Sequence, residues 1–231
     1  GSKKSAGRSS TLEWRRRKGW KSPSWWDLQL STAIVAQPNA QAVLSLCDER
    51  LPQFHLVNVA TALHRVAKAS DRHTVVERRS LRALISRVPV LFRQGTSDDM
   101  GVSLANIMWA CAKIGYTDLP LFTLLSTEAL RHLSSMDCQE CSNMVWAFAT
   151  LEIYHEHLIK DWRQRSLQLI SEFSTQDLAN SSWAYAKLGV RDLPFMQAVA
   201  VHADDKLLLG IPQNISNVAW AIGTLMLESP P

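Results

Sequence analysis

The sequence predicts an all-α protein, an α-solenoid of tandem helical hairpins with about 37 residues per repeat. The first observation is an Asn-x-x-Trp-Ala motif that recurs with its tryptophans 37 residues apart, at Trp109, Trp146, Trp183 and Trp220. The second is helical apolar periodicity around each copy of the motif. The third is a composition of 46% hydrophobic residues with only 9 glycines and 9 prolines. Such a chain can bury one continuous core.

Residues 1–26 carry eight Lys or Arg against Glu13 alone, interleaved with tryptophans. Basic residues among aromatics favour contacts with a nucleic-acid backbone and its bases, while the alternative is a solvated linker whose tryptophans pack on the first helices. We interpret residues 1–38 as a basic, Trp-rich, partly disordered segment. Residues 39–231 are expected to form the solenoid, with about four helix-pair repeats and a terminal half-repeat. Asn39 is expected to cap a helix that stands in for the second helix of a missing repeat.

The first repeat, near residues 51–69, is degenerate. A shift of 48 residues places Asn58 on the Asn of the motif and Thr61 on the Trp, so Arg65 takes the polar position seven residues after the Asn. A helix is expected at roughly residues 71–88, where Arg78, Arg79, Arg82 and Arg87 lie beside an apolar face. A charged outer face is the usual interpretation of such a run, and a phosphate-contacting edge is the alternative.

The later repeats each read as a helical hairpin. Capping-box pairs predict where the first helices begin, and glycines predict left-handed C-terminal caps. The pairs are Ser174 with Asp177 and Asp137 with Glu140, and the glycines are Gly115 and Gly189. Asp-Leu-Pro at residues 118–120 and 192–194 then opens the second helix. After Trp220 the sequence supplies one more first helix.

Two copies of the motif, residues 106–115 and 180–189, read N-x-x-W-A-x-A-K-[IL]-G. This pattern resembles the octotricopeptide and closely related heptatricopeptide repeat proteins of algae and their parasitic relatives, over roughly residues 51–228. The resemblance implies a right-handed α-solenoid that binds single-stranded RNA. It also implies a plastid or mitochondrion as location and a role in transcript processing, stability or translation.

Side chains at i, i+4, i+7 and i+11 form a polar stripe on each first helix, as Gln176, Asn180, Trp183 and Lys187 show. Stacked repeats would place these stripes side by side. The candidate RNA-binding residues are Asn58, Arg65, Val102, Asn106, Lys113, Gln139, Asn143, Thr150, Gln176, Asn180, Lys187, Gln213, Asn217 and Thr224. The repeated Asn has two open interpretations, a contact with RNA or a structural hydrogen bond to the next repeat. For the tryptophans, packing between repeats is favoured over base stacking.

Charge favours a rival function. Residues 94–231 carry eight basic and fifteen acidic side chains, which is unusual for a nucleic-acid binder, so a protein-interaction scaffold is the alternative.

Cys138-x-x-Cys141 lies at a helix N-terminus, where the dipole lowers a thiol pKa, yet Cys141 takes the apolar place of Leu104, Leu178 and Ile215 in the other repeats. We therefore expect packing there and no metal. With no phosphate-binding glycine loop or nucleophile motif, and no apolar run of bilayer length, we expect no enzyme, cofactor, small-molecule substrate or membrane partner.

Overall fold

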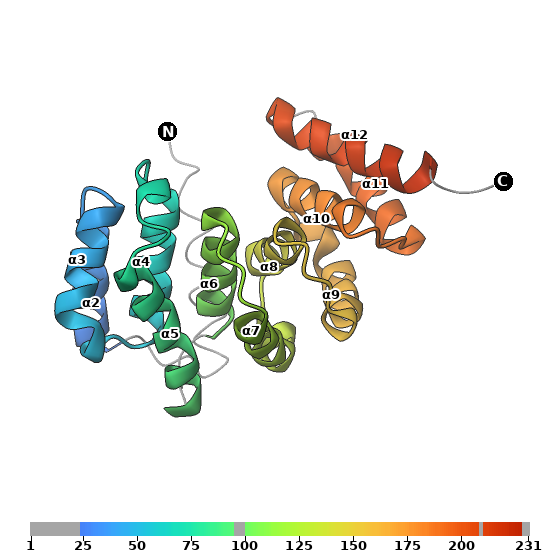
Figure 1. Ribbon diagram of the computed structural model, residues 1–231. Coiled ribbons are helices and arrows are strands. Elements are labelled where there is room, and N and C mark those ends of the chain that lie inside the picture. The colour runs from blue at the N-terminus through green and yellow to red at the C-terminus, as the bar shows by residue number, and fades with distance from the viewer. Residues whose placement is uncertain (1–23, 95–99, 208–209, 228–231) are drawn as a thin grey trace, which may run out of the picture.

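The computed structural model describes residues 24–94, 100–207 and 210–227, and Figure 1 shows their helices following one another along a curved row. All regular elements in these ranges are helical, which confirms the all-α prediction. The first helices of successive pairs are α2 (Trp25–Val35), α4 (Leu56–Lys68), α6 (Met100–Ile114), α8 (Cys138–Thr150), α10 (Thr175–Lys187) and α12 (Pro212–Leu227). The second helices are α3 (Ala40–Arg50), α5 (Arg79–Gln94), α7 (Leu119–His132), α9 (Glu156–Leu169) and α11 (Leu193–Leu207).

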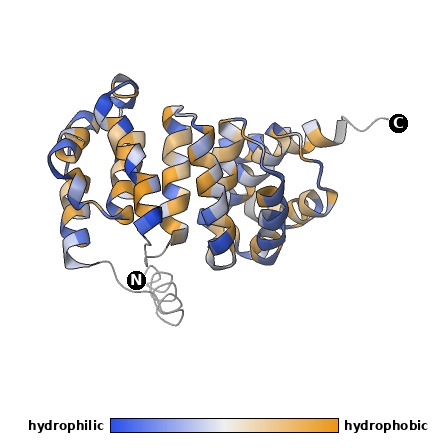
Figure 2. Cartoon of the chain, turned by 60° about the horizontal axis from the view of Figure 1, so that its bottom comes forward, coloured by the Kyte–Doolittle hydropathy of each residue, from blue (hydrophilic) through white to orange (hydrophobic). Residues whose placement is uncertain are grey.

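These helices form two layers. Each first helix packs along the next one, from α2 through α12, whereas the second helices contact one another over shorter stretches, in the pairs α3 with α5, α7 with α9 and α9 with α11. The first helices are therefore the more tightly spaced layer, as on the concave side of a curved array. Hydrophobic and hydrophilic residues alternate around the helices in Figure 2, as amphipathic packing requires.

The predicted caps of the first helices are confirmed. Asp137 and Glu140 form a reciprocal capping box on α8, and Ser174 and Asp177 form one on α10. Gly115 and Gly189 have φ angles of 75° and 67° after α6 and α10, so both adopt the left-handed conformation expected of a C-terminal cap. Glu152 takes the same place after α8, with a φ of 56°. One repeat thus makes the same turn without a glycine.

The second helices begin as predicted where Asp-Leu-Pro precedes them. The carboxylate of Asp118 accepts from the N–H of Leu121, and that of Asp192 from the N–H of Phe195. In the intervening repeat the ring of His155 caps α9 in the same way. A histidine thus replaces the acidic cap without changing the hairpin.

An aromatic cluster joins three helices in the C-terminal half. Trp162 of α9 is fully buried, and its ring centroid lies 5.1 Å from that of Tyr185 on α10 and 5.3 Å from that of Phe195 on α11. Its indole N–H donates to the carbonyl of Cys141 at 2.8 Å. This tryptophan lies outside the repeated motif and holds neighbouring repeats together.

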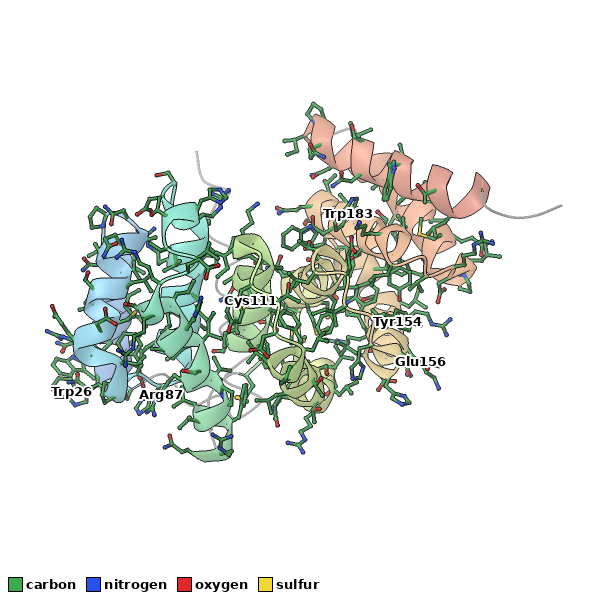
Figure 3. The ribbon with its side chains drawn as sticks, viewed as in Figure 1. Trp26, Arg87, Cys111, Tyr154, Glu156 and Trp183 are labelled. Carbon is green, nitrogen blue, oxygen red and sulfur yellow. The ribbon has the colours of Figure 1, made fainter. Side chains whose placement is uncertain are left out.

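The array begins earlier than the expected boundary at residue 39. Ser24 and Asp27 form a capping box on α2, and this helix packs on α4 as α4 packs on α6. Its tryptophans Trp25 and Trp26 are 61% and 68% exposed, and Figure 3 shows Trp26 at the outer end of the array, so they do not pack on the first helices as one interpretation proposed. Residues 1–23 lie outside the described residues. Asn39 does cap α3, where its side chain accepts from the N–H of Ala42.

Two further expectations need correction. The helix expected at residues 71–88 is a short 3₁₀ turn at Arg72–Thr74 followed by α5, which begins at Arg79 and continues past Pro89 to Gln94. Ile215 is 44% exposed, whereas its equivalents Leu104, Cys141 and Leu178 are fully buried. The reason is positional, because α12 is the last helix in the described part of the chain and no later helix packs on it there.

Candidate nucleic-acid interface

Each central first helix leaves only one narrow line of side chains open to solvent. On α6 every residue is buried except Val102, Asn106, Trp109 and Lys113. On α8 and α10 the corresponding positions are again accessible, and apart from the first residue of each helix all others are buried. The accessible residues there are Gln139, Asn143, Trp146 and Thr150 on α8, and Gln176, Asn180, Trp183 and Lys187 on α10. We call this line, repeated on each first helix, the open stripe.

Aromatic rings run across the repeats through the middle of the open stripe. The centroids of Trp109 and Trp146 are 6.5 Å apart, and those of Trp146 and Trp183 are 6.4 Å apart (Figure 3 labels Trp183). His64 of α4 extends the row, with its ring centroid 5.1 Å from that of Trp109. These tryptophans therefore pack between repeats, as favoured, while remaining partly accessible. Trp220 of α12 is 46% exposed.

The position of His64 shows that the predicted register of α4 was wrong. Asn58 is fully buried and serves as the third residue of the helix, where Glu140 and Asp177 complete the caps of α8 and α10. Its amide donates to the carbonyl of Asp27 at 2.9 Å and to the hydroxyl of Ser31 at 3.1 Å. Asn58 is thus a structural residue outside the open stripe.

Aligning α4 by its cap makes the offset from α6 45 residues instead of 48. Thr61 then replaces the repeated Asn, His64 replaces the Trp and Lys68 takes the last position. The accessibility pattern agrees, because Thr61 and His64 are partly exposed and Lys68 is exposed. Arg65 leaves the stripe, and its guanidinium donates to the carbonyl of Gln37 at 2.8 Å. The sequence signal that identifies this register is the cap, not the single matching Asn.

The hydrogen bonds of the asparagine amides bear on the two interpretations left open by the sequence. Asn106, Asn143 and Asn180 are partly exposed, and their side chains make no hydrogen bond to any residue that the structure describes. On α12 the amide of Gln213 donates to Asn217 at 2.9 Å, within one helix. Among the candidate asparagines within the described ranges, Asn58 alone makes a hydrogen bond to another repeat. The three central amides therefore keep their donors and acceptors available for a ligand.

The last position of the open stripe carries the cations. The ammonium group of Lys113 lies 5.9 Å from the centroid of Trp146, which allows a cation–π contact. Lys187 forms an exposed ion pair with Glu152 at 2.6 Å. Thr150 has a buried hydroxyl that lacks a partner among the described atoms, and Thr224 is partly exposed. The stripe residues four positions before and seven positions after the repeated Asn therefore differ between repeats in side-chain size and charge.

Many carboxylates of the acidic half serve as helix caps away from the open stripe. Asp118 and Asp192 cap second helices, while Asp137, Glu140 and Asp177 form the boxes of α8 and α10. Asp177 also accepts from the hydroxyl of Ser142 at 2.6 Å, across two repeats. The formal charge of residues 94–231 therefore overstates the negative charge at the stripe, whose own positions carry lysines and no acidic residue, and where Glu152 pairs with Lys187.

The Cys138-x-x-Cys141 pair has the properties of packing residues. Burial raises the pKa of Cys138 to about 11 and raises the pKa of Cys141 further, so the helix N-terminus does not produce a reactive thiolate. In the described ranges no group of three His, Cys, Asp or Glu residues is arranged to hold a metal ion.

Comparison with known proteins adds a family. The model of the RNA-editing substrate-binding complex 6 protein family, RESC6, matches residues 40–219. The match is to this family and not specifically to octotricopeptide or heptatricopeptide repeat proteins. No curated protein matches the chain. Among the described helices none is both long and apolar enough to span a bilayer. With most of its length matched, the chain belongs to the RNA-editing substrate-binding complex 6 protein family.

Proposed function

We propose that this protein binds single-stranded RNA along the open stripe and acts in organellar RNA processing, stability or translation, as a non-enzymatic subunit of an RNA-editing substrate-binding complex. The observation that carries the proposal is the set of three amides, Asn106, Asn143 and Asn180, which occupy equivalent positions on successive helices and have no partner among the described residues. The printed name of the family supports a role at an RNA substrate. The repeat's resemblance to octotricopeptide proteins supports an organelle.

The open stripe offers the groups that single-stranded RNA requires. Unpaired amides can exchange hydrogen bonds with base edges, and partly exposed indoles offer apolar surface for bases. Lysines at the end of the stripe can contact phosphates. Because the repeated Asn is constant, selection among bases would come from the two stripe positions whose residue changes from repeat to repeat. These are Val102, Gln139, Gln176 and Gln213 on one side, and Lys113, Thr150, Lys187 and Thr224 on the other.

A role as a protein scaffold remains the second candidate, on a different surface. Trp25 and Trp26 are more than half exposed at the outer end of α2, where apolar surface is costly in water. A complex, as the family name specifies, also requires protein contacts. We therefore assign protein partners to surfaces other than the open stripe.

The experiment is a triple substitution of Asn106, Asn143 and Asn180 to Ala, with RNA affinity measured by fluorescence anisotropy on a single-stranded oligonucleotide. Since these amides make no internal hydrogen bond, we expect an unchanged melting temperature and an affinity at least about tenfold lower. Gln164→Ala with Gln197→Ala, on exposed positions of second helices, is the matched control. Normal RNA affinity in the triple variant would remove the stripe from the proposal. Failure of the wild type to bind RNA at low salt would favour the scaffold.

A further inference from the structure

A small polar cavity lies at the α4 end of the open stripe. It has a volume of about 200 Å³ and is lined by Asn39 before α3, by Arg65 and Lys68 of α4, and by Ser70 after it. Lys68 is also the last stripe residue of α4, the equivalent of Lys113 and Lys187. The cavity is therefore continuous with the proposed RNA surface.

The lining of this cavity has unpaired donors. The guanidinium of Arg65 uses one terminal nitrogen for Gln37 and has no partner for the other terminal nitrogen, Nη1, in the described structure, and no carboxylate lies within ion-pair distance of Arg65 or Lys68 there. The side-chain oxygen of Asn39 already accepts from the N–H of Ala42, which leaves its amide hydrogens to donate. The hydroxyl of Ser70 makes no internal hydrogen bond. Two cations and two neutral donors around one cavity suit a tetrahedral anion.

The carboxylate of Asp71, which follows Ser70 in the chain, belongs to a different contact. Asp71 accepts from the N–H groups of Ala40 at 2.9 Å and Gln41 at 3.2 Å, and so satisfies the first turn of α3. It is not among the residues that line the cavity. An anion in the cavity would therefore be held by side chains and would not compete with Asp71 for the helix N-terminus.

We infer that the cavity between Arg65 and Lys68 binds a phosphate group of the RNA strand that lies on the open stripe. The inference rests on the proposed function for the source of the phosphate, and on the cavity for its place. It fixes where the strand meets the α4 end of the array. It also gives Arg65, which the corrected register removes from the stripe, a contact with RNA through its unpaired Nη1.

The electrostatics of His64 offer an independent readout. Burial first, and then the charges of Lys68 and Arg65, lower the pKa of this imidazole. A phosphate in the cavity would partly neutralise both cations. The pKa of His64 is then expected to rise towards its ordinary value of 6.5 when inorganic phosphate is added.

The test uses two variants with different losses. Lys68→Gln removes a charge at an exposed position, and we expect RNA affinity about tenfold lower, with the slope of log affinity against log salt reduced by about 0.7. Arg65→Lys keeps the charge but removes the guanidinium donors, so affinity should fall while the slope stays constant. Lys160→Gln, an exposed lysine of α9, is the control and should change neither. Melting temperatures measured by circular dichroism establish that each variant is folded.

The RNA end identifies the kind of phosphate. Oligonucleotides with a 5′-phosphate, a 3′-phosphate or only hydroxyl ends are compared on the wild type and Lys68→Gln. A loss confined to one phosphorylated end assigns a terminal phosphate, and an equal loss on all three assigns a phosphodiester. If Lys68→Gln kept the wild-type RNA affinity and salt slope, the phosphate site in the cavity would be overturned, while RNA binding on the open stripe would be unaffected. If the wild type binds no RNA, titration of His64 by NMR with added inorganic phosphate tests whether the cavity binds phosphate. A phosphate-dependent rise in its pKa, absent in Lys68→Gln, supports the site, and an unchanged pKa overturns it.

Discussion

Glu152 offers a precise test of the repeat geometry, because it is a non-glycine residue in the left-handed conformation. Its φ of 56° matches the 75° and 67° of Gly115 and Gly189 at the same place in the neighbouring repeats. Left-handed backbone costs an L-residue about 1–2 kcal/mol, and glycine loses about 0.5–1 kcal/mol more entropy on folding. Glu152→Gly should therefore raise the melting temperature by about 1–3 °C.

Two matched variants separate backbone from side chain. Glu152→Ala removes the ion pair with Lys187 but keeps a Cβ, and because that pair is exposed we expect almost no change in stability. Gly189→Ala is the mirror experiment. No atom lies within 4 Å of the added Cβ, so its expected cost of about 1 kcal/mol is purely conformational. The assay is thermal unfolding by circular dichroism. If Glu152→Gly were no more stable than Glu152→Ala, the reasoning would be refuted.

The remaining stability predictions use the same assay. Trp146→Ala should cost about 2–4 kcal/mol because it breaks ring contacts with both neighbouring repeats, whereas Trp220→Ala, nearly half exposed, should cost about 1; equal losses would contradict the ring row. Asn58→Ala should cost about 1–3 kcal/mol through its buried hydrogen bonds, and Asn143→Ala almost nothing; the reverse order would restore the rejected register. Hydrogen bonding from the N–H of Ala40 lowers the pKa of Asp71 from 3.8, so the ionised carboxylate stabilises the fold above that pH. The wild type should therefore unfold with a higher free energy than Asp71→Asn near neutral pH, and this difference should vanish as the pH falls through the lowered pKa.

Local rules were sufficient for most of the array. The spacing of the motif gives the repeats, and the capping boxes and glycines fix the ends of the first helices with side-chain chemistry that acts over one turn. Since these interactions are local, Asp137, Ser174 and Gly189 could be assigned without any knowledge of the packing. The open stripe of α6, α8 and α10 follows from the same periodicity.

The expectations that failed depend on contacts between repeats. An Asn in α4 can match the repeated Asn by letter, but only its bonds to Asp27 and Ser31 show that Asn58 is buried. The exposure of Ile215 depends on whether a further helix covers it. The pKa of Cys141 depends on burial by other repeats, which outweighs the local helix dipole. Each of these is set by neighbours distant in sequence.

The cations of the open stripe limit how strongly salt should weaken RNA binding. Lys68, Lys113 and Lys187, with Arg65 beside them, offer four phosphate contacts, and each releases counterions equivalent to a slope of about 0.7 on single strands. The array should therefore show a slope of log affinity against log salt near −3, with the rest of the affinity due to amides and rings that salt does not screen. Lys113→Gln and Lys187→Gln should each reduce the slope by about 0.7. A slope steeper than −3 that is unchanged in both variants would show that other basic residues contact the phosphates, either those of residues 1–26 or the arginines of α5.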